Sequence, residues 1–250
     1  MPWSWTAAKR LNRKNFMRPY IICHMVSSVD GKIDGASLRV VMPNGEYEKT
    51  GAKLKGDAWI CGRTTMQQHF AEKKPFVSAS NKPAGPKPVF VARRARSYAI
   101  CVDTLGKLRW RSCDLDGDHL ICVVSQKAPA DYVAMLREKE ISYIVSGKSS
   151  VHLASAVKQL RKHFGVCTLL LEGGGHLNGG FLQAGLVDEV SVLIVPGIDG
   201  RHDIPAVFDG LSPSAKTAFP LKLKSVERRP QDTLWLRYRV VRRRTSDVTK

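Results

Sequence analysis

The chain has 250 residues, of which 43% are hydrophobic and 25% are charged, and this composition is that of an ordinary globular protein. Its 40 Lys and Arg residues against 22 Asp and Glu residues give a net charge of +18, which favours anionic partners or is simply spread over a basic surface. No stretch approaches the ~18 consecutive apolar residues of a membrane-spanning helix, and residues 1–17 lack the apolar core of a secretory signal.

The cysteines give no sign of a metal or redox centre. None of the six belongs to a C-x-x-C pair, which argues against a zinc knuckle and a dithiol redox site, and we expect no bound metal. A zinc deaminase module is absent too, because no H-x-E is followed by P-C-x-x-C. All cysteines but Cys113 lie in apolar runs, where free cysteine acts as a small buried hydrophobe, and this fits a reducing cytoplasm.

The first predicted element is a buried strand over residues 19–26, which follows a basic N-terminal extension over 1–17. Two Asp-Gly steps come next and predict a turn-rich loop. Its Ser28 and Asp30 either form local turn hydrogen bonds or belong to a functional site. A helix is predicted over 46–55.

The second predicted strand, 57–61, turns directly into a helix that reaches about Phe70. At the start of this helix, Thr64 or Thr65 is suited to the N-cap position. A hydroxyl there also suits a phosphate or a ribose. His69 on the same helix is more simply a surface or core histidine than a catalytic one.

The middle of the chain alternates strands with helices. Residues 72–87 are rich in Pro, Lys and Ser and predict an irregular loop, and residues 114–118 predict an acidic turn. An amphipathic helix is predicted over 151–164, with Gly165 as its C-terminal stop. The other predicted elements are strands over 88–92, 98–102, 119–124 and 141–145, and a helix that begins near Pro129.

Residues 168–180 combine an apolar, β-favouring run, a carboxylate and three consecutive glycines. This pattern predicts a buried strand that ends at Glu172, a tight turn, and a helix that reaches Gly185. Glycines let the backbone approach a ligand closely, and the N–H groups at a helix start attract phosphate. Because open α/β sheets bind ligands at the carboxyl ends of their strands, Glu172 is a candidate site residue. A glycine-rich connection without a ligand is the alternative.

The C-terminal part is rich in β-structure. A long strand is predicted over 186–196, and an antiparallel pair over 219–226 and 233–241, the last with period-two alternation. Strands that alternate with helices before a β-rich end predict an α/β fold with a mixed, mostly parallel central sheet flanked by helices. No linker divides the chain, so we expect one domain over 18–241 and a basic tail over 242–250.

Three segments, taken in order, resemble the signatures of the pyrimidine reductases of riboflavin biosynthesis, which form the C-terminal half of the bifunctional deaminase–reductase. The segments are SSVDGKI (27–33), DAWICGR (57–63) and LEGGG (171–175), the last together with LVDE (186–189). The resemblance implies a dihydrofolate-reductase-like fold, a dimer, and NADPH as the cofactor. It also implies reduction of the ribosyl group of 5-amino-6-(5-phosphoribosylamino)uracil to ribityl.

The resemblance further implies roles for individual residues. Catalytic roles fall to Glu172, which would hydrogen-bond the substrate, and to Asp30, which would shape the site. Ser37 and Lys53 would bind the substrate together with Glu172, with Lys53 near its phosphate, whereas solvent exposure is expected for Lys49. The cofactor would be held by Gly62, Thr65, Gly173, Gly174, Gly175, His176 and Leu177, with the glycine amides on its pyrophosphate.

The chain departs from the family in three places. The loop over 34–41 is shorter, Gln68 and His69 stand where an acidic residue and a proline are common, and the deaminase half is missing. We therefore expect a stand-alone reductase, with a pterin or folate-like substrate as one alternative and a basic nucleic-acid-binding protein as another. The proton donor is open among Glu172, His69 and a bound water, and the arginines that can meet a cofactor 2′-phosphate are Arg39, Arg63, Arg93 and Arg94.

Overall fold

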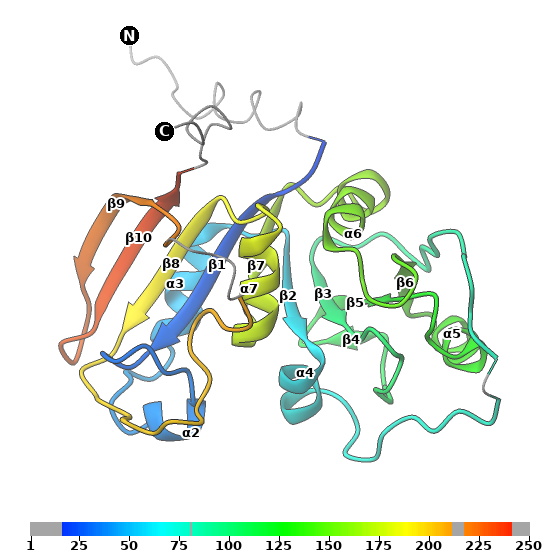
Figure 1. The fold of residues 1–250 in the computed structure, drawn as a ribbon, viewed down its shortest axis with the longest axis horizontal. Coiled ribbons are helices and arrows are strands. Elements are labelled where there is room, and N and C mark those ends of the chain that lie inside the picture. Colours follow the sequence, from blue (N-terminus) through cyan, green and yellow to red (C-terminus); the bar gives the residue numbers. More distant parts are fainter. Residues whose placement is uncertain (1–16, 81, 212–217, 242–250) are drawn as a thin grey trace, which may run out of the picture. The chain divides into compact units, whose positions relative to one another are not determined.

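The computed structural model describes residues 17–80, 82–211 and 218–241, so the expected tail 242–250 and nearly all of the N-terminal extension lie outside it. The fold is α/β, with ten strands in a mixed, mostly parallel sheet, as the sequence predicts. By internal contacts the chain divides into two compact units, which are described one at a time (Figure 1). Unit 1 contains residues 55–170 and unit 2 contains residues 21–54 and 171 onward.

Unit 1 is built on parallel strands. In register, β2 pairs with β3, β3 with β5, and β5 with β6, while β4 adds an antiparallel hairpin to β5. The strands are β2 (Ala58–Gly62), β3 (Tyr98–Val102), β4 (Asp114–Leu115), β5 (Asp118–Val124), β6 (Ser142–Val145) and β7 (Thr168–Leu171). The helices are α4 (Arg63–His69), α5 (Ala130–Glu138) and α6 (Leu153–Gln159), which continues into the π-helical turn η1 (Leu160–Phe164) and ends at Gly165 with a left-handed φ of 74°.

The core of unit 1 explains the apolar runs of its strands. β3 is buried along its whole length, and fully buried Trp110 and Tyr132 pack into the same core. Three cysteines of the core stand in register on neighbouring strands, and none of the three is in a disulfide: Cys61, Cys101 and Cys122. Burial raises the pKa of Cys101 and Cys122 well above the ordinary value, so these thiols act as packing groups.

Unit 2 combines a parallel and an antiparallel pairing. β1 runs parallel to β8, and β8, β10 and β9 follow one another as antiparallel neighbours, with β9 as the outer strand. The strands are β1 (Tyr20–Ser27), β8 (Glu189–Ile194), β9 (Leu221–Arg228) and β10 (Leu234–Val240). The helices are α2 (Gly35–Leu38), α3 (Glu46–Leu54) and α7 (Gly175–Gln183). The predicted antiparallel pair at the C-terminal end is therefore confirmed.

Two local predictions are wrong. The strand expected over 88–92 is reduced to a single bridge between Phe90 and Tyr143, since Pro88 has no N–H to donate to a ladder. The threonine N-cap expected for α4 is absent, because Gly62 takes the N-cap position and supplies no side-chain hydrogen bond. Within the described ranges, no helix has both the length and the apolar character needed to cross a membrane.

Candidate active site

The loop after β1 is fastened to the loop after β8. Asp30 accepts hydrogen bonds from the backbone N–H groups of Asp199 and Gly200, at 3.0 and 2.8 Å. The Ser28 hydroxyl and these two amides lower the pKa of Asp30 to about 2. Because β1 and β8 are parallel, both loops leave the same edge of the sheet. Asp30 therefore holds these two loops together at this edge of the sheet.

Ser37 belongs to a charged network on the same edge. Its hydroxyl lies 2.8 Å from Asp199 Oδ2 and 3.1 Å from the carbonyl oxygen of Asp34. Arg201 bonds both carboxylates, at 2.6 Å from Asp34 and 2.7 Å from Asp199, and lowers the pKa of each. The Ser37 oxygen keeps lone pairs that can accept a bond from a ligand, while its proton is engaged with the network.

The glycine-rich turn has a structural use that the sequence did not indicate. An alanine Cβ at Gly175 would lie 2.3 Å from the carbonyl oxygen of Ala206, and one at Gly179 would lie 1.9 Å from that of Asp209. Asp209 N–H donates to the Gly175 oxygen at 2.9 Å, and Asn178 Nδ2 donates to the Val207 oxygen at 2.8 Å. These two glycines thus let residues 206–209 pack directly on α7.

The start of α7 still offers free donors. Gly174, with φ of 72°, precedes the helix, and its carbonyl oxygen accepts from Leu177 and Asn178. Among the described residues, none accepts a hydrogen bond from the N–H of Gly175 or His176. Unpaired amides at the start of a nine-residue helix are suited to an anion, so the turn fits the pyrophosphate predicted here.

Glu172 follows β7 directly and is half-buried. Burial raises the pKa of the Cys23 thiol in β1, and the charge of Glu172 raises it further. The effect of its charge on Cys23 indicates that the Glu172 carboxylate lies near the middle of β1. Because its pKa is raised, the Cys23 thiol stays protonated and is not a nucleophile.

Lys53 and Lys49 both project from α3, as predicted, and both are exposed. Lys53 Nζ lies 5.6 Å from the centre of the Trp235 ring and 3.9 Å from Glu227 Oε2. These contacts hold the ammonium group over the β10 strand without burying it, and its charge stays accessible to a phosphate.

The predicted cofactor residues of unit 1 stand where β2 ends. Gly62 is the last residue of β2 and the N-cap of α4, and Thr65 lies half-buried in the first turn of that helix. His69, at the other end of α4, is exposed, and its ring meets Phe70 edge-on at 6.2 Å. Since His69 and Thr65 stand at opposite ends of the helix, His69 is the weaker candidate for a group that acts on the cofactor.

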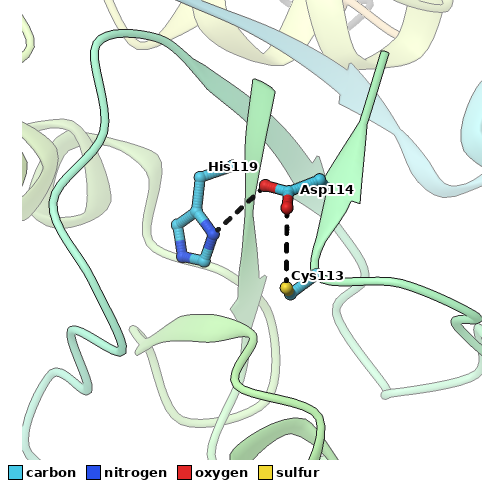
Figure 2. A group of neighbouring side chains, drawn as sticks. All are labelled: Cys113, Asp114 and His119. Atoms are coloured by element: carbon cyan, nitrogen blue, oxygen red, sulfur yellow. Dashed lines mark hydrogen bonds and ion pairs between the residues drawn. The ribbon is translucent and has the colours of Figure 1, made fainter. Parts of the chain in front are cut away.

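Three side chains of types that can bind a metal ion lie close together in unit 1, around the start of β5 (Figure 2). The ligand atoms of Cys113, Asp114 and His119 lie within 4.8 Å of one another. Arg93, however, donates from Nε to His119 Nδ1 at 3.2 Å and pairs with Asp114. Burial and this guanidinium lower the pKa of His119. A metal would have to displace Arg93, so the cluster is better explained as an ion-paired hairpin.

Comparison with known proteins shows the family to which the chain belongs. The model of the RibD C-terminal domain matches residues 19–235, which is most of the chain. The chain belongs to the RibD C-terminal domain family. It is 31% identical over 198 residues to the 2,5-diamino-6-ribosylamino-4(3H)-pyrimidinone 5′-phosphate reductase of Methanothermobacter thermautotrophicus, covering 78% of this chain and 85% of that protein.

Two further proteins are similar to this chain. The reductase of the same name from Archaeoglobus fulgidus is 26% identical over 200 residues, with 78% of this chain and 89% of that protein covered. A pyrimidine reductase-like protein from Corynebacterium diphtheriae has the same fold, with a TM-score of 0.67 at 17% identity over 90% of this chain and 93% of that one. Since the curated relatives are named reductases, this RibD-family chain is an oxidoreductase.

Sequence reasoning missed the loop after β8. Asp199, Arg201 and Asp209 hold the candidate site of this RibD-family chain together, yet none of them was singled out as a site residue. The available signal was the pair of Asp-Gly steps at Asp199 and Asp209, which marks two more turns. Their partners, however, are set by the path of the chain.

Proposed function

We propose that this chain is an NADPH-dependent reductase of riboflavin biosynthesis that acts in the cytoplasm. The observation that carries the proposal is the similarity to the Methanothermobacter protein, whose name states a 2,5-diamino-6-ribosylamino-4(3H)-pyrimidinone 5′-phosphate reductase. We therefore place this pyrimidinone ahead of the aminouracil phosphate that the sequence signatures first suggested. The ribosyl group would be reduced in either compound.

The residues divide into those that bind and those that shape the site. NADPH supplies the hydride when bound. The free amides of Gly175 and His176, with the turn before them, would hold the NADPH pyrophosphate. Thr65 of α4 would contact the cofactor. Lys53 would bind the substrate phosphate, and Ser37 and Glu172 would bind polar groups of the substrate. Asp30 would keep the loop after β1 in place through its two amide bonds.

The function is tested with purified protein and both nicotinamide nucleotides. We expect NADPH oxidation when the diaminopyrimidinone phosphate is added, and slower turnover with the aminouracil phosphate or with NADH. Turnover of dihydrofolate but of neither pyrimidine would replace the substrate assignment with the folate-like alternative. If neither nucleotide binds at millimolar concentration, the reductase proposal is wrong.

Two lysines of α3 provide a matched control for the substrate site. Lys53→Ala is expected to raise the KM for the phosphorylated pyrimidine about 10- to 100-fold, because a charge-assisted contact to phosphate is lost. Lys49→Ala removes the same charge one turn earlier on the same exposed helix and is expected to leave the KM within about twofold. Equal effects of the two changes would show general electrostatic attraction in place of a Lys53 contact.

We also propose that the active form is a homodimer joined through the outer ribbon of unit 2 (Figure 1). One face of the ribbon is apolar and partly exposed, with Leu223 and Val226 each 53% accessible. On the other face, Lys224 and Arg237 both bond Glu189. Apart from Arg228, which pairs with Leu234 at one end of the face and bonds Asp232, the charges of the two strands are directed away from the apolar face. Two strongly basic chains can therefore meet there. Its residues are Leu221, Leu223, Val226, Leu234, Leu236, Tyr238 and Val240.

Light scattering is expected to give twice the mass of one chain. Leu223→Glu places a charge in the proposed interface and is expected to yield the monomer, because a buried unpaired charge is costly. Lys222→Glu changes a neighbouring exposed residue that faces the other way and is expected to leave the dimer intact. A wild-type protein that is monomeric at all concentrations would contradict this assignment.

A further inference from the structure

Unit 1 presents a ligand-binding edge that carries a free arginine. The register of β2, β3 and β5 aligns Gly62 with Val102 and Val102 with Val123, so these parallel strands end at one level. Arg63 follows Gly62 directly, at the edge where open α/β sheets bind their ligands. Its side chain is exposed, and its guanidinium makes no hydrogen bond or ion pair with any residue that the structure describes.

The other arginines that the sequence allowed for a cofactor phosphate are placed differently. Arg93 is occupied by Asp114 and His119. Arg93 and Arg94 precede β3 and therefore lie toward the opposite, amino edge of the unit 1 strands. Arg39 belongs to unit 2, two residues after Ser37, in the segment assigned to the substrate. Arg63 alone of these four shares its unit and its helix turn with Thr65.

The charges around Arg63 favour an anion. Asp103, directly after β3, is the acid whose pKa the charge of Arg63 affects, and its side chain is fully buried. Its Oδ2 accepts from Lys107 N–H, Leu108 N–H and the Tyr132 hydroxyl at 2.7, 2.8 and 3.0 Å. Burial raises the pKa of Asp103, and the positive charge of Arg63 opposes that rise. The carboxylate is therefore withdrawn from the surface, where Arg63 and the exposed Lys107 remain.

We infer that Arg63 binds the 2′-phosphate of NADPH and is the residue that makes the enzyme prefer NADPH over NADH. The inference rests on the proposed reductase function, in which Thr65 of the same helix turn contacts the cofactor. A guanidinium offers a planar fork of donors that matches phosphate and stays charged at every working pH. NADH carries a neutral hydroxyl at this position and gains nothing from the charge.

The test compares NADPH and NADH binding to the wild type and to Arg63→Ala by calorimetry. We expect the Kd for NADPH to rise about 10- to 100-fold and the Kd for NADH to stay within about twofold. Arg63→Lys keeps the charge without the fork and is expected to fall between the two. Arg94→Ala is the matched control, since it removes an exposed arginine of the same unit from the other edge, and it is expected to change neither Kd.

The possible results separate this inference from the proposed function. Tight NADPH binding that Arg63→Ala leaves unchanged would overturn the role of Arg63 and leave the reductase standing. Equal weakening of NADPH and NADH would also overturn it, because Arg63 would then contact a part common to both nucleotides. If the wild type binds neither nucleotide, the proposed function fails and the inference fails with it. Competition by adenosine 2′,5′-bisphosphate, lost in Arg63→Ala and not matched by inorganic phosphate, would support it.

Discussion

Gly179→Ala is expected to lower the free energy of unfolding by about 3 kcal/mol. The new Cβ would lie 1.9 Å from the carbonyl oxygen of Asp209, and a backbone atom cannot move aside as the end of a side chain can. The Asp209 loop is also fixed by hydrogen bonds to Gly175 and within itself to Ala206, both at 2.9 Å. Either α7 or this loop must shift.

The sign of this prediction is informative, because alanine is the better helix former. In an exposed helix, Gly→Ala stabilises by about 1 kcal/mol. Gly179 lies inside α7 and has no positive φ, so helix propensity alone predicts a more stable variant. A measured loss therefore reports the close approach of residues 206–209 and nothing else.

Gly35→Ala is the matched control for this measurement. Gly35 begins α2 in the same unit, and a Cβ there would meet no atom within 4 Å. Urea denaturation is expected to give a change of less than about 0.5 kcal/mol for this variant. If Gly179→Ala behaves like Gly35→Ala, the packing of the Asp209 loop on α7 is not the reason for the glycine.

His24 is expected to make the protein lose stability as the pH falls below 6.5. It is fully buried in β1, and its ring stacks on Tyr47 with a centroid distance of 4.5 Å. The Tyr47 carbonyl oxygen can only accept, so Nε2 of neutral His24 is the donor and Nδ1 the acceptor. The Ser191 hydroxyl therefore donates to His24 Nδ1 at 3.0 Å, and its oxygen accepts from Trp235 Nε1 at 2.8 Å. The proton of the neutral ring is then on Nε2, which donates to the Tyr47 oxygen at 3.2 Å.

Burial, with a smaller contribution from the charge of Arg237, lowers the pKa of His24 from 6.5 to about 4. In the unfolded chain His24 takes up a proton near pH 6.5, whereas in the folded protein it stays neutral until about pH 4. Unfolding therefore consumes a proton between these values, and the free energy of unfolding falls with the pH. The difference between the two pKa values corresponds to about 3 kcal/mol of stability, which is fully present above pH 7 and fully lost near pH 4.

The measurement compares wild type with His24→Gln by denaturation between pH 7 and pH 4. Glutamine has no proton to gain in this interval, so the stability advantage of the wild type is expected to shrink by about 3 kcal/mol as the pH falls. His202→Gln is the control, since His202 is exposed in the same unit with 98% side-chain accessibility. An advantage of the wild type that stays constant with pH would contradict the role of His24.

Much of the fold was accessible from local pattern. The apolar runs before the Asp-Gly loop and before the glycine turn became β1 and β7, and the alternation over 233–241 became β10. Gly165 ends its helix with a positive φ, as its position after an amphipathic segment predicts. Each of these signals comes from neighbours within a few residues, where backbone propensity and side-chain period decide. The strand over 88–92 is reduced to the bridge between Phe90 and Tyr143 of β6, because Pro88 has no N–H to donate to a ladder.

The candidate site shows the limit of such reasoning. The residues of the family signatures were named from the sequence, and their roles in binding remain predictions. The sequence by itself determined the order of the elements, the α/β class and the family. These follow from the periodicity of apolar residues and from short motifs, which involve only residues close together in the chain. Only the tertiary structure decided that Gly175 and Gly179 accommodate residues 206–209, that Asp30 holds the loop of Asp199, and that Arg63 is free while Arg93 is paired. These contacts join groups some 20 to 170 residues apart, and which groups meet at that separation depends on the path of the whole chain.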